Sequence, residues 1–426
     1  MSPANEVRFG LLGRTLGHSW SPQIHARLGS TPYVLVEREP ADARTFVREG
    51  DWSGLNVTIP YKRLAAEASD EVSPRVQRLG VANTLVHRDD GSIFAENTDV
   101  LGFSWMLRQF AQSSWGSTAA QALDERKVLV LGSGGACQAV RAALEDAACC
   151  TVRVISRTGD DTYDNLLERH GDAALVVNTT PVGMYPNCPT TPLASETLAK
   201  LPQLMGVLDV VYNPERTGIC LAAEELGIPY QSGLGMLVAQ AFYASQLFQN
   251  TDLDEGLISK LTDDIRASQR NIVLIGMPGA GKTTTGRALA RMVGRPFIDL
   301  DDAFAVETGV DASGFITQYG ERAFRERETE VARRYGAQSG LVIACGGGIV
   351  TQQRNYALLH QNATICFIDR PLHELSSSGR PLSQTRGVLQ LALERMDLYR
   401  SWADLAISCT GTASGDAMLL KAKLGL

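Results

Sequence analysis

Residues 271–294 read NIVLIGMPGAGKTTTGRALARMVG, a short apolar run that leads through a glycine-rich turn into a helical pattern. The turn from Gly276 to Thr283 matches the GxxxxGK[ST] phosphate-binding pattern in its strand–loop–helix context. In such a loop the backbone amides cradle phosphates, the lysine reaches the β- and γ-phosphates, and the hydroxyl ligates Mg²⁺. The sequence therefore predicts an ATP and Mg²⁺ site. The residues expected to contact ATP are Gly276, Gly279, Ala280, Gly281, Lys282, Thr283 and Thr284.

Similar apolar runs alternate with longer amphipathic stretches along the chain, which predicts parallel α/β sheets. The expected strands are Val7–Leu12, Tyr33–Val36, Val128–Leu131, Val152–Ile155, Leu175–Asn178, Val207–Val211, Ile272–Ile275 and Thr364–Ile368. With 426 residues, two or three domains of ordinary size are expected. The main boundary is predicted where a helix over Leu253–Arg266 and a short linker, Ala267–Arg270, precede the strand at Asn271. A second boundary is predicted near Gly102.

Composition and charge restrict the possible partners and location. The net charge is -7, with 44% hydrophobic and 20% charged residues, which gives no reason to expect nucleic acid or a membrane surface as a partner. We find no apolar run of about 18 residues and no signal-peptide pattern, so a cytoplasmic protein is expected. The eight cysteines form no CxxC pair, which fits neither a zinc site nor a disulfide framework.

A second glycine-rich turn, Gly132-Ser133-Gly134-Gly135-Ala136, follows the expected strand Val128–Leu131 and precedes the helical pattern Ala136–Ala147. Glycines there allow a dinucleotide pyrophosphate to approach the backbone at a helix N-terminus. The next strand ends in Ser156-Arg157-Thr158, and a cation at this position suits the 2′-phosphate of NADP. Arg157 therefore favours NADP. Asp160 and Asp161 are close by and would repel a phosphate if they pointed inward, so NAD stays open. A solvated surface arginine is the alternative role for Arg157.

Three polar clusters in the first hundred residues suit a small polyhydroxylated acid as substrate. They are residues 17–22 with His25, residues 56–62 and residues 97–99. Lys62 is placed to protonate a carbonyl oxygen as hydride arrives, and Asp99 to orient it or stabilise its charge. Ser19 and Ser21 have hydroxyls for a carboxylate, although capping of a helix that begins near Pro22 also explains them.

These clusters resemble the signature of shikimate dehydrogenase. The matching motifs are Ser19-Trp20-Ser21-Pro22, Asn56–Lys62, Asn83-Thr84, Asn97-Thr98-Asp99, Asn178–Met184, Asp209 with Tyr212 and Pro214, and Gly235-Met236-Leu237 with Gln240. The resemblance spans about residues 7–268. It implies NADPH-dependent reduction of 3-dehydroshikimate to shikimate, with Lys62 and Asp99 catalytic. It implies substrate contacts from Ser19, Ser21, Asn56, Thr58, Asn83, Tyr212 and Gln240. The implied NADP contacts are Gly132, Ser133, Gly134, Gly135, Ala136, Ser156, Arg157, Thr158, Thr179, Met184 and Gly233.

Residues from about 271 to 410 resemble shikimate kinase. Besides the phosphate-binding loop, the matching positions are Asp299-Leu300-Asp301, Phe324-Arg325, Gly346-Gly347-Gly348, Arg380-Pro381-Leu382, and Arg395 ahead of Leu398-Tyr399. The resemblance implies that Thr283 and Asp299 hold Mg²⁺ and that Asp301 acts on the 3-hydroxyl of shikimate. It implies shikimate contacts from Asp301, Arg325, Gly347, Gly348 and Arg395, and catalytic roles for Asp301, Lys282 and the lid residue Arg380.

The expected fold is α/β throughout. A shikimate dehydrogenase-like substrate domain (1–102 and 235–268) and a Rossmann NADP domain (103–234) precede a P-loop domain like that of nucleoside monophosphate kinases (271–426). The expected function is a bifunctional enzyme that converts 3-dehydroshikimate to shikimate and then to shikimate 3-phosphate. Two alternatives stay open. One is an NAD-preferring quinate/shikimate dehydrogenase fused to the kinase. The other is a chain in which one half is a non-catalytic sensing module. The oligomeric state, monomer or homodimer, is also open.

Overall fold

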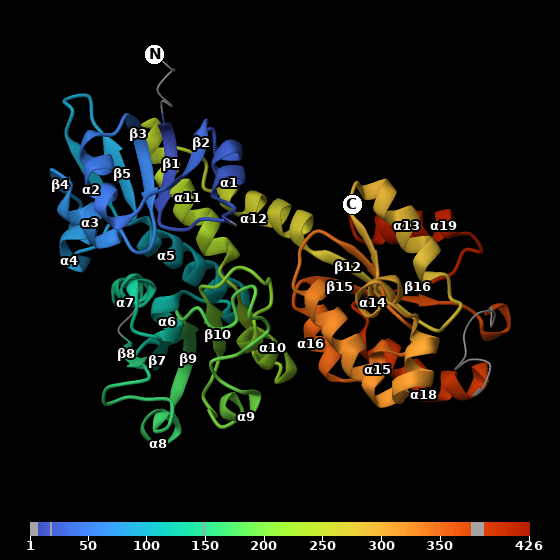
Figure 1. Ribbon diagram of the computed structural model, residues 1–426. Coiled ribbons are helices and arrows are strands. Elements are labelled where there is room, and N and C mark those ends of the chain that lie inside the picture. Colours follow the sequence, from blue (N-terminus) through green and yellow to red (C-terminus); the bar gives the residue numbers. More distant parts are fainter. Residues whose placement is uncertain (1–6, 18, 148–149, 376–386) are drawn as a thin grey trace, which may run out of the picture. The chain divides into compact units, whose positions relative to one another are not determined.

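The computed structural model describes residues 7–17, 19–147, 150–375 and 387–426. Its contacts divide the chain into two compact units. Unit 1 comprises residues 1–182, 191–212 and 222–265, and unit 2 comprises residues 183–190, 213–221 and 266–426. Unit 1 contains two sheets and unit 2 contains a third, each with helices packed against it (Figure 1). The α/β architecture predicted from the alternation of strands and helices is confirmed.

The first sheet of unit 1 has the strand order β2-β1-β3-β5-β6-β4. Strands β1, β2 and β3 run parallel, whereas β5 is antiparallel to both β3 and β6. The strands are β1 (Val7–Gly13), β2 (Tyr33–Glu37), β3 (Trp52–Val57), β4 (Glu71–Val72), β5 (Thr84–His87) and β6 (Ile93–Glu96). The accompanying helices are α1 (Ser21–Leu28), α2 (Pro40–Glu49), α3 (Lys62–Glu67), α4 (Pro74–Leu79) and α5 (Thr98–Phe110). Loops at the carboxyl ends of β1 and β3 carry the first two polar clusters.

The second sheet of unit 1 is wholly parallel, in the order β11-β10-β9-β7-β8. Its strands are β7 (Lys127–Leu131), β8 (Thr151–Ile155), β9 (Ala173–Asn178), β10 (Gly206–Asp209) and β11 (Tyr230–Gln231). Every residue of β9 is buried, as expected for a parallel strand covered on both faces. The helices after α5 are α6 (Ala119–Leu123), α7 (Gly135–Ala147), α8 (Leu166–His170), α9 (Ser195–Leu198), α10 (Gly218–Glu225), α11 (Leu234–Gln249) and α12 (Gly256–Gln269), with a π-helical turn at Ala111–Trp115.

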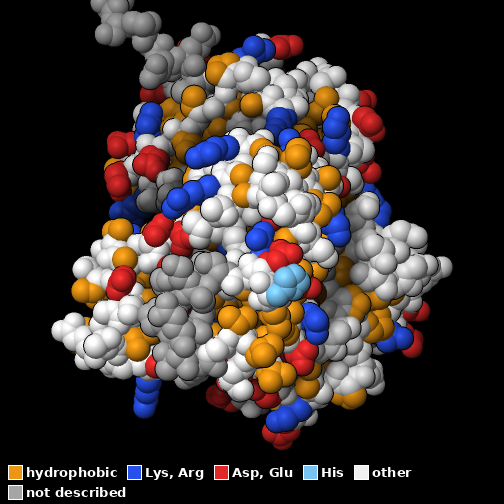
Figure 2. Space-filling view, turned by 90° about the vertical axis from the view of Figure 1, so that its right-hand side faces the viewer, with side chains coloured by type: hydrophobic (Ala, Val, Ile, Leu, Met, Phe, Trp, Pro, Cys, Tyr) orange, Lys and Arg blue, Asp and Glu red, His pale blue; other side chains and the backbone are white. Residues whose placement is uncertain are grey.

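The sheet of unit 2 is also parallel, with the order β13-β14-β12-β15-β16. Its strands are β12 (Asn271–Ile275), β13 (Phe297–Asp299), β14 (Val342–Ala344), β15 (Ala363–Asp369) and β16 (Leu405–Ser408). Its helices are α13 (Lys282–Val293), α14 (Leu300–Thr308), α15 (Ala312–Gly336), α16 (Arg354–His360), α18 (Val388–Trp402) and α19 (Ala413–Lys423), with 3₁₀ turns at Ile349–Thr351 and Leu372–Glu374. On the face in Figure 2, basic and acidic side chains of the described residues are interspersed.

Unit 2 also includes the segment 213–221, which is fixed by polar contacts. The Arg216 guanidinium donates to the carbonyl oxygens of His360 and Ala363, at 2.9 and 3.1 Å. The backbone amide of Glu215 donates to Asn362 Oδ1 at 2.7 Å, and Arg270 Nε donates to Glu215 Oε2 at 2.7 Å. This segment therefore belongs with β15 by its contacts, although it lies far from it in sequence.

The prediction that Ala267–Arg270 forms a non-helical linker is wrong, because α12 extends through Gln269. Helix α12 begins at Gly256, whose amide donates to Asp254 Oδ1, and continues to Gln269. The Arg270 amide still donates to the Arg266 carbonyl at 2.9 Å, so only Arg270 separates the helix from β12. The physical reason is that the linker residues contain no glycine or proline to end a helix.

Helices α5 and α11 pack closely in unit 1 (Figure 1), and they carry the predicted site residues Asp99 and Gln240, respectively. Gly102 of α5 makes this approach possible. A Cβ at Gly102 would lie 2.8 Å from the Met236 carbonyl oxygen and 3.1 Å from the Gln240 amide nitrogen of α11. Backbone atoms cannot rotate away as a side chain can, so the two helices would have to separate.

Gly102→Ala is therefore predicted to destabilise the protein by about 1–3 kcal/mol, the usual cost of overpacking, despite the better helix propensity of alanine. Chemical denaturation monitored by circular dichroism measures this. The matched control is Gly135→Ala in α7, where an added Cβ meets nothing within 4 Å. Equal unfolding midpoints for the two variants would contradict the close packing of these helices.

Candidate active sites

A cavity of about 300 Å³ in unit 1 brings the three polar clusters together. All nine residues predicted to act in catalysis or substrate binding line it: Ser19, Ser21, Asn56, Thr58, Lys62, Asn83, Asp99, Tyr212 and Gln240. Ala136 and Gly233, predicted as NADP contacts, line the same cavity. Val57, Met236 and Leu237 from the quoted motifs supply apolar walls, and Leu11 and Val210, which no motif indicated, add to them. The cavity therefore joins the predicted substrate groups to the dinucleotide turn.

Lys62 and Asp99 form a partly shielded ion pair in this cavity. Lys62 Nζ lies 2.6 Å from Asp99 Oδ2, and the side chains are 21% and 16% exposed. Both residues lie at helix N-termini, Lys62 as the first residue of α3 and Asp99 in the first turn of α5. A helix N-terminus stabilises the carboxylate and opposes the ammonium, so the ion pair offsets an unfavourable field at Lys62. The pair can hold a charged proton donor in place.

Asn83 fixes the other oxygen of Asp99. Its side-chain amide donates to Asp99 Oδ1 at 2.9 Å, while its own Oδ1 accepts from the Thr98 amide at 2.7 Å. Thr84 Oγ1 also donates to Asn83 Oδ1, at 3.2 Å. Because both ends of the Asn83 side chain are engaged, the carboxylate cannot rotate freely, and Lys62 is held at one position in the cavity.

Ser19 and Ser21 contact each other at the start of α1. Ser19 Oγ donates to Ser21 Oγ at 3.1 Å and accepts from the Ser21 amide at 3.2 Å. The helix N-cap is Trp20, which makes no side-chain capping bond. The first turn thus uses the Ser19 hydroxyl, while both serines still line the cavity.

Tyr33, which the sequence analysis did not single out, contacts Asn56 and His25 from two of the predicted motifs, and Asn56 in turn contacts Thr84 from a third. The buried hydroxyl of Tyr33 donates to Asn56 Oδ1 at 2.8 Å, and Asn56 Nδ2 donates to Thr84 Oγ1 at 3.2 Å. The His25 ring stacks on Tyr33 at 4.0 Å between centroids. Burial lowers the pKa of His25 to about 3, which a hydrogen bond with Asn56 opposes, so this imidazole is neutral near pH 7. Burial likewise raises the pKa of Tyr33. The only signal in the sequence was the expected strand at Tyr33–Val36.

The dinucleotide turn lies between β7 and α7, as predicted. Gly132 has φ +97°, and a Cβ there would lie 2.7 Å from Thr180 Cγ2. Thr179 Oγ1 donates to the Leu131 carbonyl oxygen at 2.6 Å and so fixes the neighbouring loop. An added Cβ at Gly134 or Gly135 would meet no atom within 4 Å, which leaves space for a ligand against the N-terminus of α7. Ser133 and Ala136 complete this turn.

The loop after β8 contains the residues expected to distinguish NADP from NAD. Arg157 and Thr158 are exposed, and the Ser156 hydroxyl donates to the Thr158 carbonyl oxygen. Asp161 Oδ1 lies 2.6 Å from Arg169 Nη1 and 2.9 Å from His170 Nε2. The hydrogen bond with His170 lowers the pKa of Asp161. The charge of Asp161 is thus paired locally. Met184 is part of unit 2 by its contacts and is half-exposed.

A second cavity of about 300 Å³ lies in unit 2, at the carboxyl ends of β12, β13 and β14. Predicted residues that line it are Gly279, Gly281, Lys282, Thr283, Thr284, Asp299, Asp301, Arg325, Gly347, Gly348 and Arg395. Gly276 and Ala280 are within the loop but are not among the lining residues. Gly276 has φ +147°, and a Cβ there would lie 2.7 Å from the Ile368 carbonyl oxygen. Arg380 lies outside the described residues.

The phosphate-binding loop is ordered around Lys282 and Thr283. Lys282 Nζ donates to the carbonyl oxygens of Gly276 and Met277, at 2.9 and 3.0 Å. Thr283 Oγ1 donates to Asp299 Oδ2 at 2.6 Å. A hydroxyl next to a carboxylate fits Mg²⁺, which prefers oxygen ligands and commonly takes only one or two carboxylates besides phosphate and water. Among the described residues, no group of three or more His, Cys, Asp or Glu could hold a metal.

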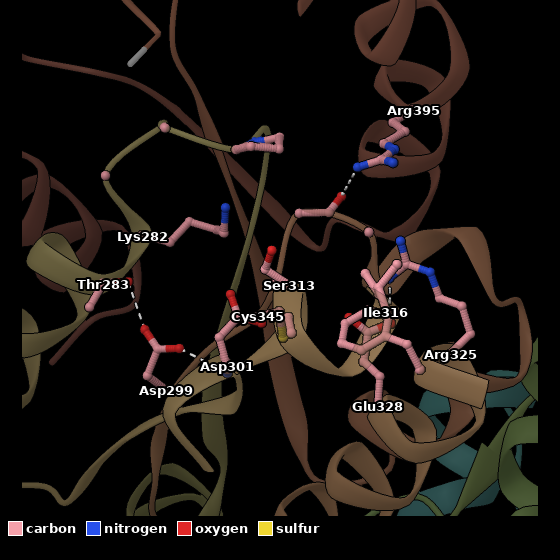
Figure 3. A pocket seen from close by; sticks show the side chains of 18 of the residues that line it. Lys282, Thr283, Asp299, Asp301, Ser313, Ile316, Arg325, Glu328, Cys345 and Arg395 are labelled. Carbon is pink, nitrogen blue, oxygen red and sulfur yellow. Dashed lines mark hydrogen bonds and ion pairs between the residues drawn. The ribbon is translucent and has the colours of Figure 1, made fainter. Parts of the chain in front are cut away.

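Asp301 lies between the phosphate-binding loop and two buried arginines (Figure 3). Although the residue keeps solvent exposure, partial removal of the carboxylate from water in the cavity raises its pKa, and the neighbouring Asp299 carboxylate adds to this effect. Arg325 Nη1 lies 2.7 Å from Glu328 Oε2, and Arg395 Nη1 donates to the Gly347 carbonyl oxygen at 3.1 Å. Glu328 also lines the cavity and was missed, although its spacing of three residues from Arg325 on a helix was a usable signal. The arrangement presents a base and two cations to one small ligand.

Taken together, the geometry defines an enzyme with two sites, a nicotinamide-dependent oxidoreductase and a P-loop phosphotransferase. Residues 11–85 match the family model "Shikimate dehydrogenase substrate binding domain", and residues 278–421 match the model "Shikimate kinase". A shikimate dehydrogenase (NADP(+)) of Oleidesulfovibrio alaskensis is 36% identical over 281 residues, covering 61% of this chain and 96% of that protein. The relative from a Ruegeria strain is 35% identical over 262 residues, covering 54% and 88%.

Solved structures of related dehydrogenases resemble the fold of this chain. A chorismate mutase/shikimate 5-dehydrogenase fusion protein from Clostridium acetobutylicum has a TM-score of 0.54 and 30% identity, covering 62% of this chain and 98% of that one. A quinate dehydrogenase from Corynebacterium glutamicum in complex with NAD has a TM-score of 0.52 and 27% identity, covering 61% and 98%. The chain belongs to the shikimate dehydrogenase family and carries a C-terminal shikimate kinase domain. It is a bifunctional enzyme of the shikimate pathway.

Tyr33→Phe is predicted to raise the KM for shikimate in the dehydrogenase reaction severalfold, with little change in kcat. The variant leaves Asn56 Oδ1 without its donor in a buried position, and an unsatisfied buried acceptor costs about 1–3 kcal/mol. Steady-state oxidation of shikimate measures this, and the kinase activity of the same chain is the internal control. An unchanged KM would show that Tyr33 does not hold Asn56 in its binding position.

Proposed function

We propose that this enzyme reduces 3-dehydroshikimate to shikimate with NADPH and then phosphorylates shikimate to shikimate 3-phosphate with ATP and Mg²⁺. The observation that carries the first half is the Lys62–Asp99 pair at 2.6 Å in a cavity shared with the dinucleotide turn. The second half is supported by Asp301 and two buried arginines in one cavity with the phosphate-binding loop.

In the first reaction, bound NADPH supplies the hydride. The Lys62 ammonium donates its proton to the carbonyl oxygen of the substrate as negative charge develops there. Asp99, held by Asn83, keeps the ammonium in place and stabilises it while it is charged. Ser19, Ser21, Asn56, Thr58, Tyr212 and Gln240 supply hydroxyl and amide groups for the substrate carboxylate and hydroxyls.

In the second reaction, bound ATP supplies the phosphoryl group. Arg325 and Arg395, with the Gly347 and Gly348 backbone, hold shikimate beside Asp301. The raised pKa of Asp301 makes its carboxylate a better acceptor for the proton of the attacking 3-hydroxyl. Thr283 and Asp299 would hold Mg²⁺, and Lys282 would neutralise charge on the β- and γ-phosphates. We further propose that Arg380 acts from the lid over the phosphates.

We infer that NADP is preferred over NAD. Arg157 is exposed beside the dinucleotide turn, and the charge of Asp161 is paired with Arg169 and His170. The relatives from Oleidesulfovibrio alaskensis and Bacillus mycoides are named as NADP(+)-dependent shikimate dehydrogenases, which supports this preference. The quinate dehydrogenase neighbour in complex with NAD keeps the other cofactor as the competing hypothesis.

We also propose the division into 1–102 with 235–268, 103–234 and 271–426 as the functional domains, and a cytoplasmic location. The thiols of Cys137, Cys188, Cys345, Cys366 and Cys409 form no disulfide, which suits a reducing compartment. Among the described residues, no helix has both the length and the apolar character required to cross a bilayer.

The cofactor preference yields a direct prediction. Arg157→Ala should raise the KM for NADP⁺ about 10- to 100-fold, the effect of losing a charge-assisted hydrogen bond to phosphate, and leave the KM for NAD⁺ unchanged. Arg153→Ala, which removes an exposed cation from the preceding strand, is the matched control. Equal losses with both cofactors would contradict a 2′-phosphate contact, and better turnover of quinate with NAD⁺ by the wild type would favour the competing hypothesis.

The separation of the two cavities predicts that each reaction can be lost without the other. Lys62→Ala should abolish dehydrogenase activity and spare the kinase, whereas Asp301→Asn should do the reverse, because each residue lies in its own cavity. Separate spectrophotometric assays of the two reactions measure this. Loss of both activities in either folded variant would overturn independent sites, and binding without turnover in one wild-type half would support a sensing module.

A further inference from the structure

Arg370 is a cation beside the phosphate-binding loop that the proposed reaction does not yet use. It directly follows β15, and its Nη2 lies 3.8 Å from the position that a Cβ would take at Gly281. Its side chain is 20% exposed, and its Nε is buried without a hydrogen-bond partner. Arg370 is not among the residues that line the acceptor cavity. The guanidinium thus has donor capacity left over next to a phosphate site.

Neighbouring side chains contact the Arg370 guanidinium, but none accepts a hydrogen bond from its Nε. Asp416 Oδ2 lies 3.8 Å from Arg370 Nη2, too far for a hydrogen bond, and is itself buried without a hydrogen-bond partner. The Cys409 side chain contacts Arg370 and lies 3.9 Å from the Ala280 carbonyl oxygen. Asp416 Oδ1 accepts from the amide and hydroxyl of Thr410, at 2.6 and 2.8 Å. Arg370 is therefore held beside the loop by the Cys409 side chain and a long ion pair with Asp416, while its Nε donor stays unused.

The strand order shows which end of ATP would meet Arg370. The sheet runs β13-β14-β12-β15-β16, and β12 leads into the phosphate-binding loop. The acceptor groups Asp301 and Gly347 follow β13 and β14, on one side of β12. Arg370 follows β15, on the other side. Because the γ-phosphate must face the acceptor, the nucleoside end of the triphosphate extends toward β15 and β16.

We propose that Arg370 binds the α-phosphate of the nucleotide through Nε–H, with Asp416 orienting the guanidinium. The inference rests on the proposed kinase function. A phosphate oxygen supplies the acceptor that Nε lacks, and charge-assisted bonds from arginine to phosphate are among the stronger ones in proteins. A purely structural role, in which Arg370 tethers the segment from Cys409 to Asp416, would leave the buried Nε unexplained.

Titration of the full chain with ADP tests the proposal. Arg370→Ala should raise the Kd for ADP and the KM for ATP about tenfold or more, with an unchanged KM for shikimate, and Arg370→Lys should restore part of the affinity. The dependence of ADP affinity on salt should also become shallower in Arg370→Ala, because one cation no longer contacts phosphate. The matched control is Arg400→Ala, an arginine of α18 in an exposed pair with Asp397.

A Kd for ADP within twofold of wild type would overturn the proposal. So would a large loss with the wild-type salt dependence, because that result assigns Arg370 to a structural role. If Arg370→Ala melts earlier without nucleotide, Arg370→Gln is measured by the same criteria. Lys282→Ala should abolish ADP binding. If it binds ADP like the wild type, the phosphate-binding loop is not the nucleotide site, and the kinase assignment fails instead.

Discussion

The same strand–turn–helix arrangement occurs twice in the chain, and both proposed nucleotide sites depend on it. A parallel strand whose last four residues are buried ends at a glycine-rich turn, and the next helix begins there. This occurs where β7 leads into α7 and where β12 leads into α13. Partial positive charge at a helix N-terminus attracts phosphate, and glycine allows the backbone to approach it. Each nucleotide site is thus fixed by the core of its own sheet, and the remaining polar side chains are arranged around it.

The two cavities place their proposed catalytic groups in opposite electrostatic surroundings: Lys62 lies near a helix N-terminus, and Asp301 lies near carboxylates and arginines. In the dehydrogenase cavity Lys62 lies at a helix N-terminus, whose partial charge opposes an ammonium, and the Asp99 carboxylate, fixed by Asn83, pairs with it. The kinase cavity must keep a carboxylate basic among cations. Partial desolvation and the neighbouring Asp299 carboxylate raise the pKa of Asp301, while Glu328 pairs with the nearby Arg325 guanidinium. In both cases a neighbouring residue, rather than the catalytic group alone, sets the chemistry.

The sequence predicted much of this and missed identifiable parts. Strands such as β7 and β12 follow from short β-branched runs bounded by turn residues, and the glycine turns predicted the proposed nucleotide sites. Tyr33 and Glu328 were missed because a tyrosine in a strand and a glutamate in a charged helix look ordinary until tertiary contacts are known. The helical character of Ala267–Gln269 was missed because helix ends depend on small energies. The pairing of Asp161 with His170 depends on a local turn that no pattern specifies.

The central claim is that one chain carries out two consecutive reactions. The most direct measurement supplies the purified full chain with 3-dehydroshikimate, NADPH, ATP and Mg²⁺ and follows NADPH, ADP and phosphorylated product together. We expect that one NADPH is oxidised and one ADP is formed for each shikimate 3-phosphate. Accumulation of shikimate without ADP, or ADP formation without oxidation of NADPH, would contradict it.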